Sequence, residues 1–246
     1  HRRWTWAAAD FSDIARIRER FGGTVNDVVL AAITRGFRDL LIERHELDHR
    51  RMVRTLVPVS IRTADEHGNL DNRVAAMFAD LPVGVADPVH RLVSVQDELS
   101  RLKHSGERSA TEMLVALSGW APPVALGLGM RAATRFAQNV GQRAVNTVTT
   151  NVPGPPVPLY LLGRRMLEAY PFVPIGEGVR IGVAIFTYEG RVAFGLTGDY
   201  NTTPDLGVLA SGIEDGVLEL VQAAEHRPLA ETPADDDPQQ HEEVTA

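Results

Sequence analysis

The sequence has 246 residues, of which 44% are hydrophobic and 23% charged, an ordinary composition for a soluble globular protein. It contains no cysteine, so disulfides, thiol nucleophiles and cysteine-ligated metals are excluded. The formal net charge is −7, and most of it lies in acidic residues after Arg227, which leaves the body of the chain close to neutral. A near-neutral body gives no electrostatic basis for binding nucleic acid.

The first residue is His1 rather than a methionine, and the opening H-R-R-W-T-W-A-A-A-D lacks the apolar core of a signal peptide. We therefore expect a piece of a longer protein. Residues 10–21 carry apolar side chains at helical intervals and predict a short amphipathic helix that ends at Gly22-Gly23. Thr24 begins a long helix that is apolar early and charged late, so its start is expected in the core and its end, near Glu43, in solvent.

Residues 52–59 are rich in β-branched side chains, and a similar segment begins at Arg73, so both are predicted strands. The polar stretch 62–72 between them is a predicted loop. Asp87-Pro88 fits an N-cap followed by a proline in the first turn of a helix, which runs towards Lys103.

Residues 113–130 carry no charge and reach the length of a membrane span. Pro122-Pro123 interrupts the run, and this favours two core helices with a corner between them. A lipid-facing or interfacial surface is the alternative, and a spanning helix is the least favoured interpretation.

Beyond Asn146 the sequence changes to extended segments. N-T-V-T-T-N-V predicts a strand, P-G-P-P-V-P a rigid turn, and alternation on both sides of Glu189-Gly190 a hairpin. Pro204-Asp205 precedes a last helix with an apolar stripe, and the residues after it have almost nothing to bury, so we expect them to be disordered. Clustered strands and long helices predict an α+β chain rather than a regular βαβ alternation.

Residues 44–50 contain H-E-x-x-H at His45, Glu46 and His49, a pattern typical of helical zinc sites. Two imidazoles four residues apart on one helix face can share a zinc ion, and the glutamate can activate a bound water. The neighbouring arginines oppose a dication, and the charged end of the long helix is expected to be solvated. We interpret the pattern as a chance match at a helix terminus and expect no metal, with a zinc hydrolase as the remote alternative.

Two short motifs combine polar residues with turn or cap signals. Thr24 and Asp27 fit a capping box, whereas Asn26 has no such explanation, and the two residues Asn26 and Asp27 could instead orient groups in a site. In V-T-T-N-V-P-G-P-P, Asn151 can hold its own backbone or a neighbouring strand. No nucleophile elbow, phosphate-binding loop or dinucleotide fingerprint accompanies them.

Several motifs follow one another between about Trp4 and Ala224: T-V-N-D-V-V-L-A-A, L-V-P-V-S-I-R, D-N-R-V, T-N-V-P-G-P-P-V-P-L-Y-L-L-G, A-Y-P-F-V-P-I and the T-Y-E-G hairpin. In this order they resemble the C-terminal portion of the bacterial wax ester synthase/diacylglycerol acyltransferase (WS/DGAT) family. The resemblance implies a chloramphenicol-acetyltransferase-like fold, of which the chain would hold the C-terminal half, including an α/β two-layer subdomain, and the last helix of the N-terminal half.

The resemblance also implies transfer of a long-chain acyl group from acyl-coenzyme A to diacylglycerol or a fatty alcohol, with acyl-coenzyme A as co-substrate and no cofactor. The family's H-H-x-x-x-D-G motif supplies the general base and belongs to its N-terminal half. This sequence has no His-His pair. We therefore expect no catalytic residue in this chain and no activity without an N-terminal half.

Carried over residue by residue, the family's motifs imply active-site support from two residues and a structural element near the acyl channel from three others. The first set is Asn26 and Asp27, and the second is Asn151, Pro153 and Gly154.

The implied domains are the end of the N-terminal acyltransferase subdomain at 1–51, the WS/DGAT C-terminal subdomain at 52–225 and a disordered acidic tail at 226–246. The expected partners are the N-terminal half, acyl-coenzyme A and diacylglycerol or a long-chain alcohol. We also expect a cytoplasmic location, with peripheral contact to the inner membrane or lipid inclusions as a further expectation. A non-catalytic lipid- or partner-binding half-fold is the alternative function.

Overall fold

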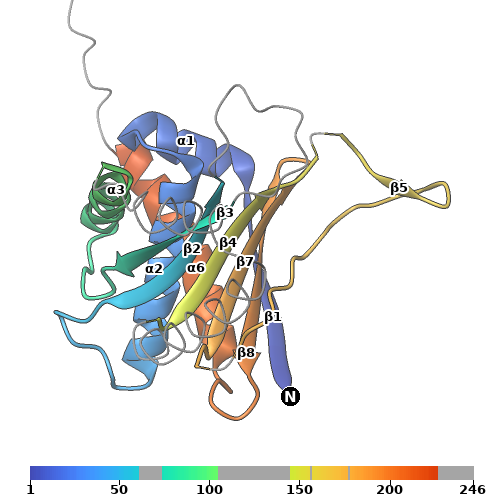
Figure 1. Ribbon diagram of the computed structural model, residues 1–246. Helices are drawn as coiled ribbons and strands as arrows, with labels where there is room; N and C mark the ends of the chain where they lie inside the picture. Colours follow the sequence, from blue (N-terminus) through green and yellow to red (C-terminus); the bar gives the residue numbers. More distant parts are fainter. Residues whose placement is uncertain (61–73, 105–144, 156, 177, 227–246) are drawn as a thin grey trace, which may run out of the picture.

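The computed structural model describes residues 1–60, 74–104, 145–155, 157–176 and 178–226. In Figure 1, helices pack on a sheet, and a slender segment, residues 157–168, which we call the arm, stands clear of this body. The elements are β1 (Arg2–Asp10), α1 (Phe11–Phe21), α2 (Val25–Glu43), β2 (Val53–Ser60), β3 (Val74–Leu81), α3 (Pro88–His104), β4 (Thr147–Pro153), β5 (Tyr160–Leu161), β6 (Arg164–Arg165), β7 (Ile181–Tyr188), β8 (Arg191–Asp199) and α6 (Leu206–His226). They confirm the predicted helices α1, α2, α3 and α6 and the predicted strands β2, β3 and β4.

Six strands form one mixed sheet in the order β1-β8-β7-β4-β2-β3. Strands β2, β4 and β7 run parallel to one another, and the remaining neighbours pair antiparallel. The predicted hairpin is β7 with β8, where Tyr188 pairs with Arg191 across Glu189 (φ 43°) and Gly190 (φ 79°). Positive φ at both turn residues matches the tight turns that suit the twist of a hairpin.

No element is predicted for residues 1–9, most of which belong to strand β1. Its A-A-A run has low β propensity, and the alternating W-T-W before it is only a short local signal. The strand is stabilised by a distant partner, because Arg2 to Asp10 pair with Asp199 to Arg191 of β8. Ala7 is fully buried beneath this edge of the sheet. A non-local partner therefore completes the sheet.

The helices cover one face of the sheet, and α2 and α6 lie at the centre of this layer. Val183 of β7 and Phe194 of β8 are fully buried in the core that these helices share with the strands. The two helix backbones come close, because a Cβ on Gly36 would lie 2.6 Å from the Leu209 carbonyl oxygen and one on Gly212 would lie 2.8 Å from the Cα of Gly36. The separation of packed helices depends on the side chains at the contact, and here glycines make it short.

Residues 1–51 share this sheet and core with the rest of the described chain. Strand β1 pairs with β8, and the buried residues of α1 and α2 belong to the same cluster as those of β7 and β8. The assignment of 1–51 to an N-terminal subdomain stays a prediction. Residues before and after position 51 nevertheless belong to one hydrophobic core. The predicted acidic tail beyond His226 and the uncharged run 113–130 lie outside the described residues. None of the described helices has the length and hydropathy of a bilayer span.

A fully buried arginine joins the helices of this layer. The Arg91 guanidinium, on α3, donates to the Glu219 carboxylate of α6 at 2.8 Å and to the Ala86 carbonyl at 3.0 Å. Arg35 of α2 pairs with the same Glu219. Burial, together with the nearby positive charges of Arg35 and Arg38, lowers the pKa of Arg91 to about 10. Glu219 therefore compensates two guanidinium groups in the helix layer.

We predict that Glu219→Gln lowers the free energy of unfolding by about 3 kcal/mol, because it leaves the buried Arg91 charge without its carboxylate. The matched control is Glu225→Gln on the same helix, whose carboxylate forms an exposed pair with Arg16. That substitution should change the free energy of unfolding by about 0.5 kcal/mol or less. Urea unfolding measures both, and equal losses would contradict a compensating role for Glu219.

Candidate functional site

The parallel strands β2, β4 and β7 finish at one end of the molecule, which we define as the strand-end site. Ligands of open α/β sheets bind outside the carboxyl ends of parallel strands. Strand β3 runs antiparallel to β2 and therefore finishes at the opposite end of the molecule. Arg38, late in α2, donates to the carbonyls of Val83 and Gly84, which follow β3, at 2.9 and 3.0 Å. The last turns of α2 thus lie at that opposite end, and its first turn lies at the strand-end site. Two segments singled out in the sequence, the start of α2 and the end of β4, thus share one end (Figure 1).

Asp27 is engaged by the start of its own helix. Its carboxylate accepts a hydrogen bond from the Thr24 N–H at 2.6 Å, and the Thr24 hydroxyl accepts one from the Asp27 N–H at 3.3 Å. This capping box confirms the structural interpretation of the T-V-N-D motif. A supporting role of Asp27 in a site would therefore act through the position of the helix start.

Asn26 differs from its neighbour Asp27. Its side chain is half-buried, and it makes no hydrogen bond to any residue within the ranges that the structure describes. Its amide atoms are not among the buried polar atoms that lack a partner in the described chain, so water can reach them. Asn26 therefore brings unused hydrogen-bonding capacity to the strand-end site.

Strand β4 ends with a second asparagine at this site. Thr147 and Thr149 are buried on the helix-facing side of the sheet, and Asn151 follows on the same side, opposite Ile185 of β7. The Asn151 side chain is half-buried and, like that of Asn26, has no hydrogen-bond partner in the described part of the chain. The two predicted asparagines thus lie at one end of the molecule, and neither amide group has a hydrogen-bond partner among the described residues.

The chain leaves β4 through Pro153 and Gly154, in close contact with the end of β7. Pro153 pairs with Thr187, and a Cβ on Gly154 would lie 2.0 Å from the Thr187 carbonyl oxygen and 2.8 Å from Cζ of Phe186. Only glycine permits so close an approach of two backbones. This contact agrees with a structural role for the P-G step, which starts the connection from β4 to β7.

Three aromatic side chains form a cluster that the motifs do not predict. Trp4 and Trp6 of β1 lie beside Tyr170, with ring centroids 6.5 and 5.3 Å from the tyrosine ring. A hydrogen bond from the Tyr170 hydroxyl to the Glu168 carboxylate, at 2.9 Å, raises the pKa of Tyr170. The signal in the sequence is W-T-W, because residues two apart in a strand share one face.

The H-E-x-x-H residues do not lie on a helix, which corrects the interpretation as a helix terminus. Helix α2 ends at Glu43, and His45 adopts a positive φ of 55°, so the motif continues into a loop. Glu46 is paired with Arg51, with 3.7 Å between the charged atoms. The shared helix face that would let His45 and His49 bind one zinc ion is therefore absent. Among the described residues, no group of three or more His, Asp or Glu side chains is placed to hold a metal ion.

The strand-end site offers amides rather than an acid–base pair. None of the histidines in the described ranges lies on β2, β4 or β7 or in the first turn of α2. The Glu189 carboxylate, just beyond β7, is bound by Arg165 at 2.8 Å. Within the described chain, this end can therefore hold and orient a polar group, whereas a base for proton transfer would have to come from elsewhere.

We predict that His45→Gly raises the free energy of unfolding by about 0.5–1 kcal/mol, because the left-handed backbone just after a helix end favours glycine. His49→Gly, the control, lacks this geometry and should not stabilise the chain. Metal analysis of the same samples tests the zinc alternative. Stoichiometric zinc in the wild-type chain that is lost in His45→Gly would contradict the loop assignment.

We predict that Gly154→Ala lowers the free energy of unfolding by about 1–3 kcal/mol, since its methyl group would press on the β7 backbone. The matched control is Gly207→Ala near the start of α6, where an added Cβ would meet nothing within 4 Å. That variant should be neutral or up to about 1 kcal/mol more stable. Thermal unfolding compares them, and an unchanged midpoint for Gly154→Ala would refute the close contact.

Residues 70–220 match the family model described as the WS/DGAT C-terminal domain. The Mycobacterium tuberculosis protein named "Probable diacyglycerol O-acyltransferase tgs1" is 41% identical over 230 residues, which cover 92% of this chain and 48% of the relative. The solved wax ester synthase/diacylglycerol acyltransferase from Marinobacter aquaeolei VT8 matches with a TM-score of 0.68 at 25% identity, over 91% of this chain and 49% of that one.

A more distant match shows how widely the fold occurs. The epimerization domain of the third module of tyrocidine synthetase B aligns with a TM-score of 0.54 at 11% identity. Together with the Marinobacter structure, it confirms the expected α+β, chloramphenicol-acetyltransferase-like fold. The chain spans about half the length of the curated relatives it matches. With the family model matching more than half of its residues, the chain belongs to the WS/DGAT family and contains its C-terminal domain.

Proposed function

We propose that this chain is the C-terminal part of an O-acyltransferase that moves a long-chain acyl group from acyl-coenzyme A to diacylglycerol or a fatty alcohol. The observation that carries the proposal is the 41% identity, over 92% of the chain, to a relative named for diacylglycerol O-acyl transfer. The likeness to a solved wax ester synthase/diacylglycerol acyltransferase supports the same reaction class.

In this proposal the chain works together with an N-terminal half. It spans 48% of the mycobacterial relative, and H-H-x-x-x-D-G does not occur in its sequence. The histidine base of that half takes the proton of the acceptor hydroxyl while the acceptor oxygen bonds to the acyl carbon. The thioester C–S bond then breaks, and the coenzyme A thiolate takes up the proton.

The contribution of this chain is the strand-end site. Asn26 and Asn151 carry half-buried amides that are free of hydrogen bonds within the described residues. Amide N–H groups are donors of the kind that hold a carbonyl or a developing oxyanion in a site shielded from water. The capping box at Thr24 and Asp27 keeps the start of α2, and therefore Asn26, in a fixed position.

We expect the purified chain alone not to transfer acyl groups, since the loss of a general base costs about 10²–10⁴-fold and the loss of half a channel removes substrate positioning. Co-expression with an N-terminal half that carries H-H-x-x-x-D-G should give turnover of radiolabelled oleoyl-coenzyme A with dioleoylglycerol or hexadecanol. The control is the same pair with the second histidine of that motif replaced by alanine. Full turnover by the chain alone would refute the proposal, and a folded pair without turnover would favour a non-catalytic lipid- or partner-binding module.

In the reconstituted pair, Asn26→Ala should lower kcat at least about tenfold and change the free energy of unfolding of the chain by about 0.5 kcal/mol or less, because its amide makes no hydrogen bond within the described chain. Asp27→Ala should instead destabilise the chain by about 1 kcal/mol through loss of the capping box. Initial rates and urea unfolding separate the two effects. A destabilised Asn26→Ala variant with normal turnover would assign Asn26 to structure alone.

A further inference from the structure

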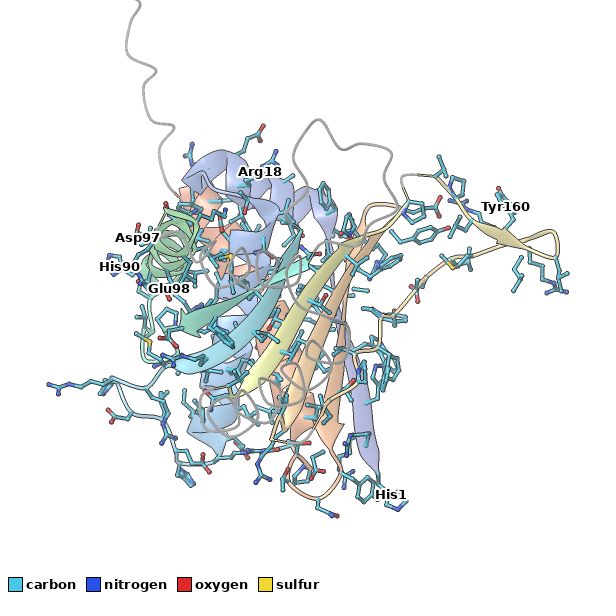
Figure 2. All side chains as sticks on the ribbon, viewed as in Figure 1. His1, Arg18, His90, Asp97, Glu98 and Tyr160 are labelled. Carbon is cyan, nitrogen blue, oxygen red and sulfur yellow. The ribbon has the colours of Figure 1, made fainter. Side chains whose placement is uncertain are left out.

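Strand β1 forms one edge of the sheet, and its outer side has no strand partner among the described elements. Figure 1 shows it beside β8, and Figure 2 marks its start at His1. The strand is nine residues long. Unpaired N–H and C=O groups along such an edge are a template for another strand, and native proteins usually protect them. The edge of β1 is therefore a place where a strand from another molecule can pair.

The register with β8 shows which residues of β1 carry the outward backbone groups. The Phe11 N–H donates to the Gly190 carbonyl, so the odd-numbered residues of β1 exchange hydrogen bonds with β8. The even-numbered residues consequently turn their N–H and C=O groups away from the sheet. The Ala8 N–H confirms this, because it donates to the Glu214 carboxylate of α6 at 3.0 Å. Glu214 thus occupies one donor of the outer edge.

The even-numbered residues of β1 also place their side chains on one face of the sheet, the face away from the helices. Trp4 is 41% exposed and Trp6 51%, whereas Ala7 is buried against the helix layer. From the start to the end of the strand, this face carries a positive residue, two tryptophans, an alanine and a negative residue: Arg2, Trp4, Trp6, Ala8 and Asp10. Opposite charges at its two ends make the strand complementary to a reversed copy of itself.

We propose that β1 is the interface of a symmetric dimer of this chain, in which it pairs antiparallel with β1 of a second copy and Trp6 lies opposite Trp6. A two-fold axis brings the same surface of both copies together, so that surface has to be self-complementary. In this register Arg2 lies opposite Asp10 of the second copy. The paired residues are those with outward backbone groups, so the two edges exchange hydrogen bonds. The inference goes beyond the proposed acyl transfer and does not depend on it.

The neighbouring strand β8 extends the charge complementarity. Arg2 lies 3.5 Å from Asp199, and Asp10 lies 3.8 Å from Arg191, measured between charged atoms. At each end of the interface, four residues then form one row in which the charges alternate: Asp199 and Arg2 of one copy, Asp10 and Arg191 of the other. Opposite charges facing each other across strands stabilise a sheet, and like charges destabilise it. A register shifted by two residues removes both Arg2–Asp10 pairs, so the charges select one register and a second copy as the occupant.

Glu214 opposes this dimer. Its carboxylate has to release the Ala8 N–H before the Trp4 carbonyl of the second copy can accept that hydrogen bond. Hydrogen bonds to ionised groups are stronger than those between neutral groups, so Glu214 stabilises the single chain. A two-fold dimer breaks this bond in both copies. Glu214 therefore raises the concentration at which dimers form.

The absence of cysteine from the sequence allows a direct test of the register. Trp6→Cys places a cysteine opposite itself, with Cα atoms about 5.5 Å apart, a separation that a disulfide spans. We expect mild oxidation to give a linked dimer on a non-reducing gel. The matched control is Trp4→Cys on the same face, which lies more than about 10 Å from its counterpart and should stay unlinked. Equal linking of the two variants, or none of Trp6→Cys, overturns the inference.

Sedimentation velocity measures association without a cross-link. The wild-type chain should shift from monomer to dimer as its concentration rises. Glu214→Ala, which frees the Ala8 N–H, should shift at a concentration at least about tenfold lower. The matched control Asp215→Ala removes the same charge from the next, exposed residue of α6 and should behave as the wild type. A wild-type chain that is monomeric at every concentration, or unchanged association of Glu214→Ala, overturns the inference.

The cross-link is also measured with the N-terminal half of the mycobacterial relative co-expressed. We expect Trp6→Cys to link as before, because the outer edge of β1 pairs with a second copy. Loss of the link in the presence of that half would assign the edge to it and overturn the inference. Acyl transfer is not a readout of these experiments, so a failure of the proposed function leaves their outcome unchanged.

Discussion

The contact between α2 and α6 is the constraint on which the rest of the fold depends, because glycines let the two backbones come close where Gly212 faces Gly36 and Gly216 faces Ala32. Gly36 faces Leu209 and Gly212 at distances that an added methyl group would close. Helix α6 also packs against β1 and α1, so the last described helix holds the first strand at the edge of the sheet. The position of the start of α2, and with it Asn26, follows from this contact and from the capping box at Thr24.

Local sequence patterns were sufficient to predict an element wherever the interaction that stabilises it joins residues close together in the sequence. The capping box at Thr24 and the hairpin turn at Glu189 are of this kind, since partner and signal are neighbours in the sequence. Strand β1 is the opposite case, because its A-A-A run becomes a strand only through β8, at the other end of the chain. The zinc pattern misled for a related reason: it assumes that a helix continues through His45, whose left-handed backbone instead lies beyond the helix end, and no glycine announces this in the sequence.

Candidate residues for the strand-end site could be named from the sequence, but their arrangement in space could not. Asn26 and Asn151 stand out from the order of the motifs, whereas their position at one end of the molecule depends on the parallel pairing of β4 with β7 and on the direction of α2. Tyr188 shows most clearly which contacts cannot be predicted from the sequence. In the sequence it is one more residue of an alternating strand, and its hydrogen bonds to Leu159 and Met166 exist only because the chain returns to the same place after the arm.

Parallel neighbours such as β4 and β7 require a crossover connection, and in this chain the crossover carries the arm. The hydrogen bonds among Leu159, Met166 and Tyr188 form a neck, so changes in residues 160–165 need not be transmitted to the sheet. The tip of the arm is in this sense structurally independent of the sheet. Residues 160–165 could therefore be exchanged for those of another family member while the pairing of β4 with β7 stays as it is.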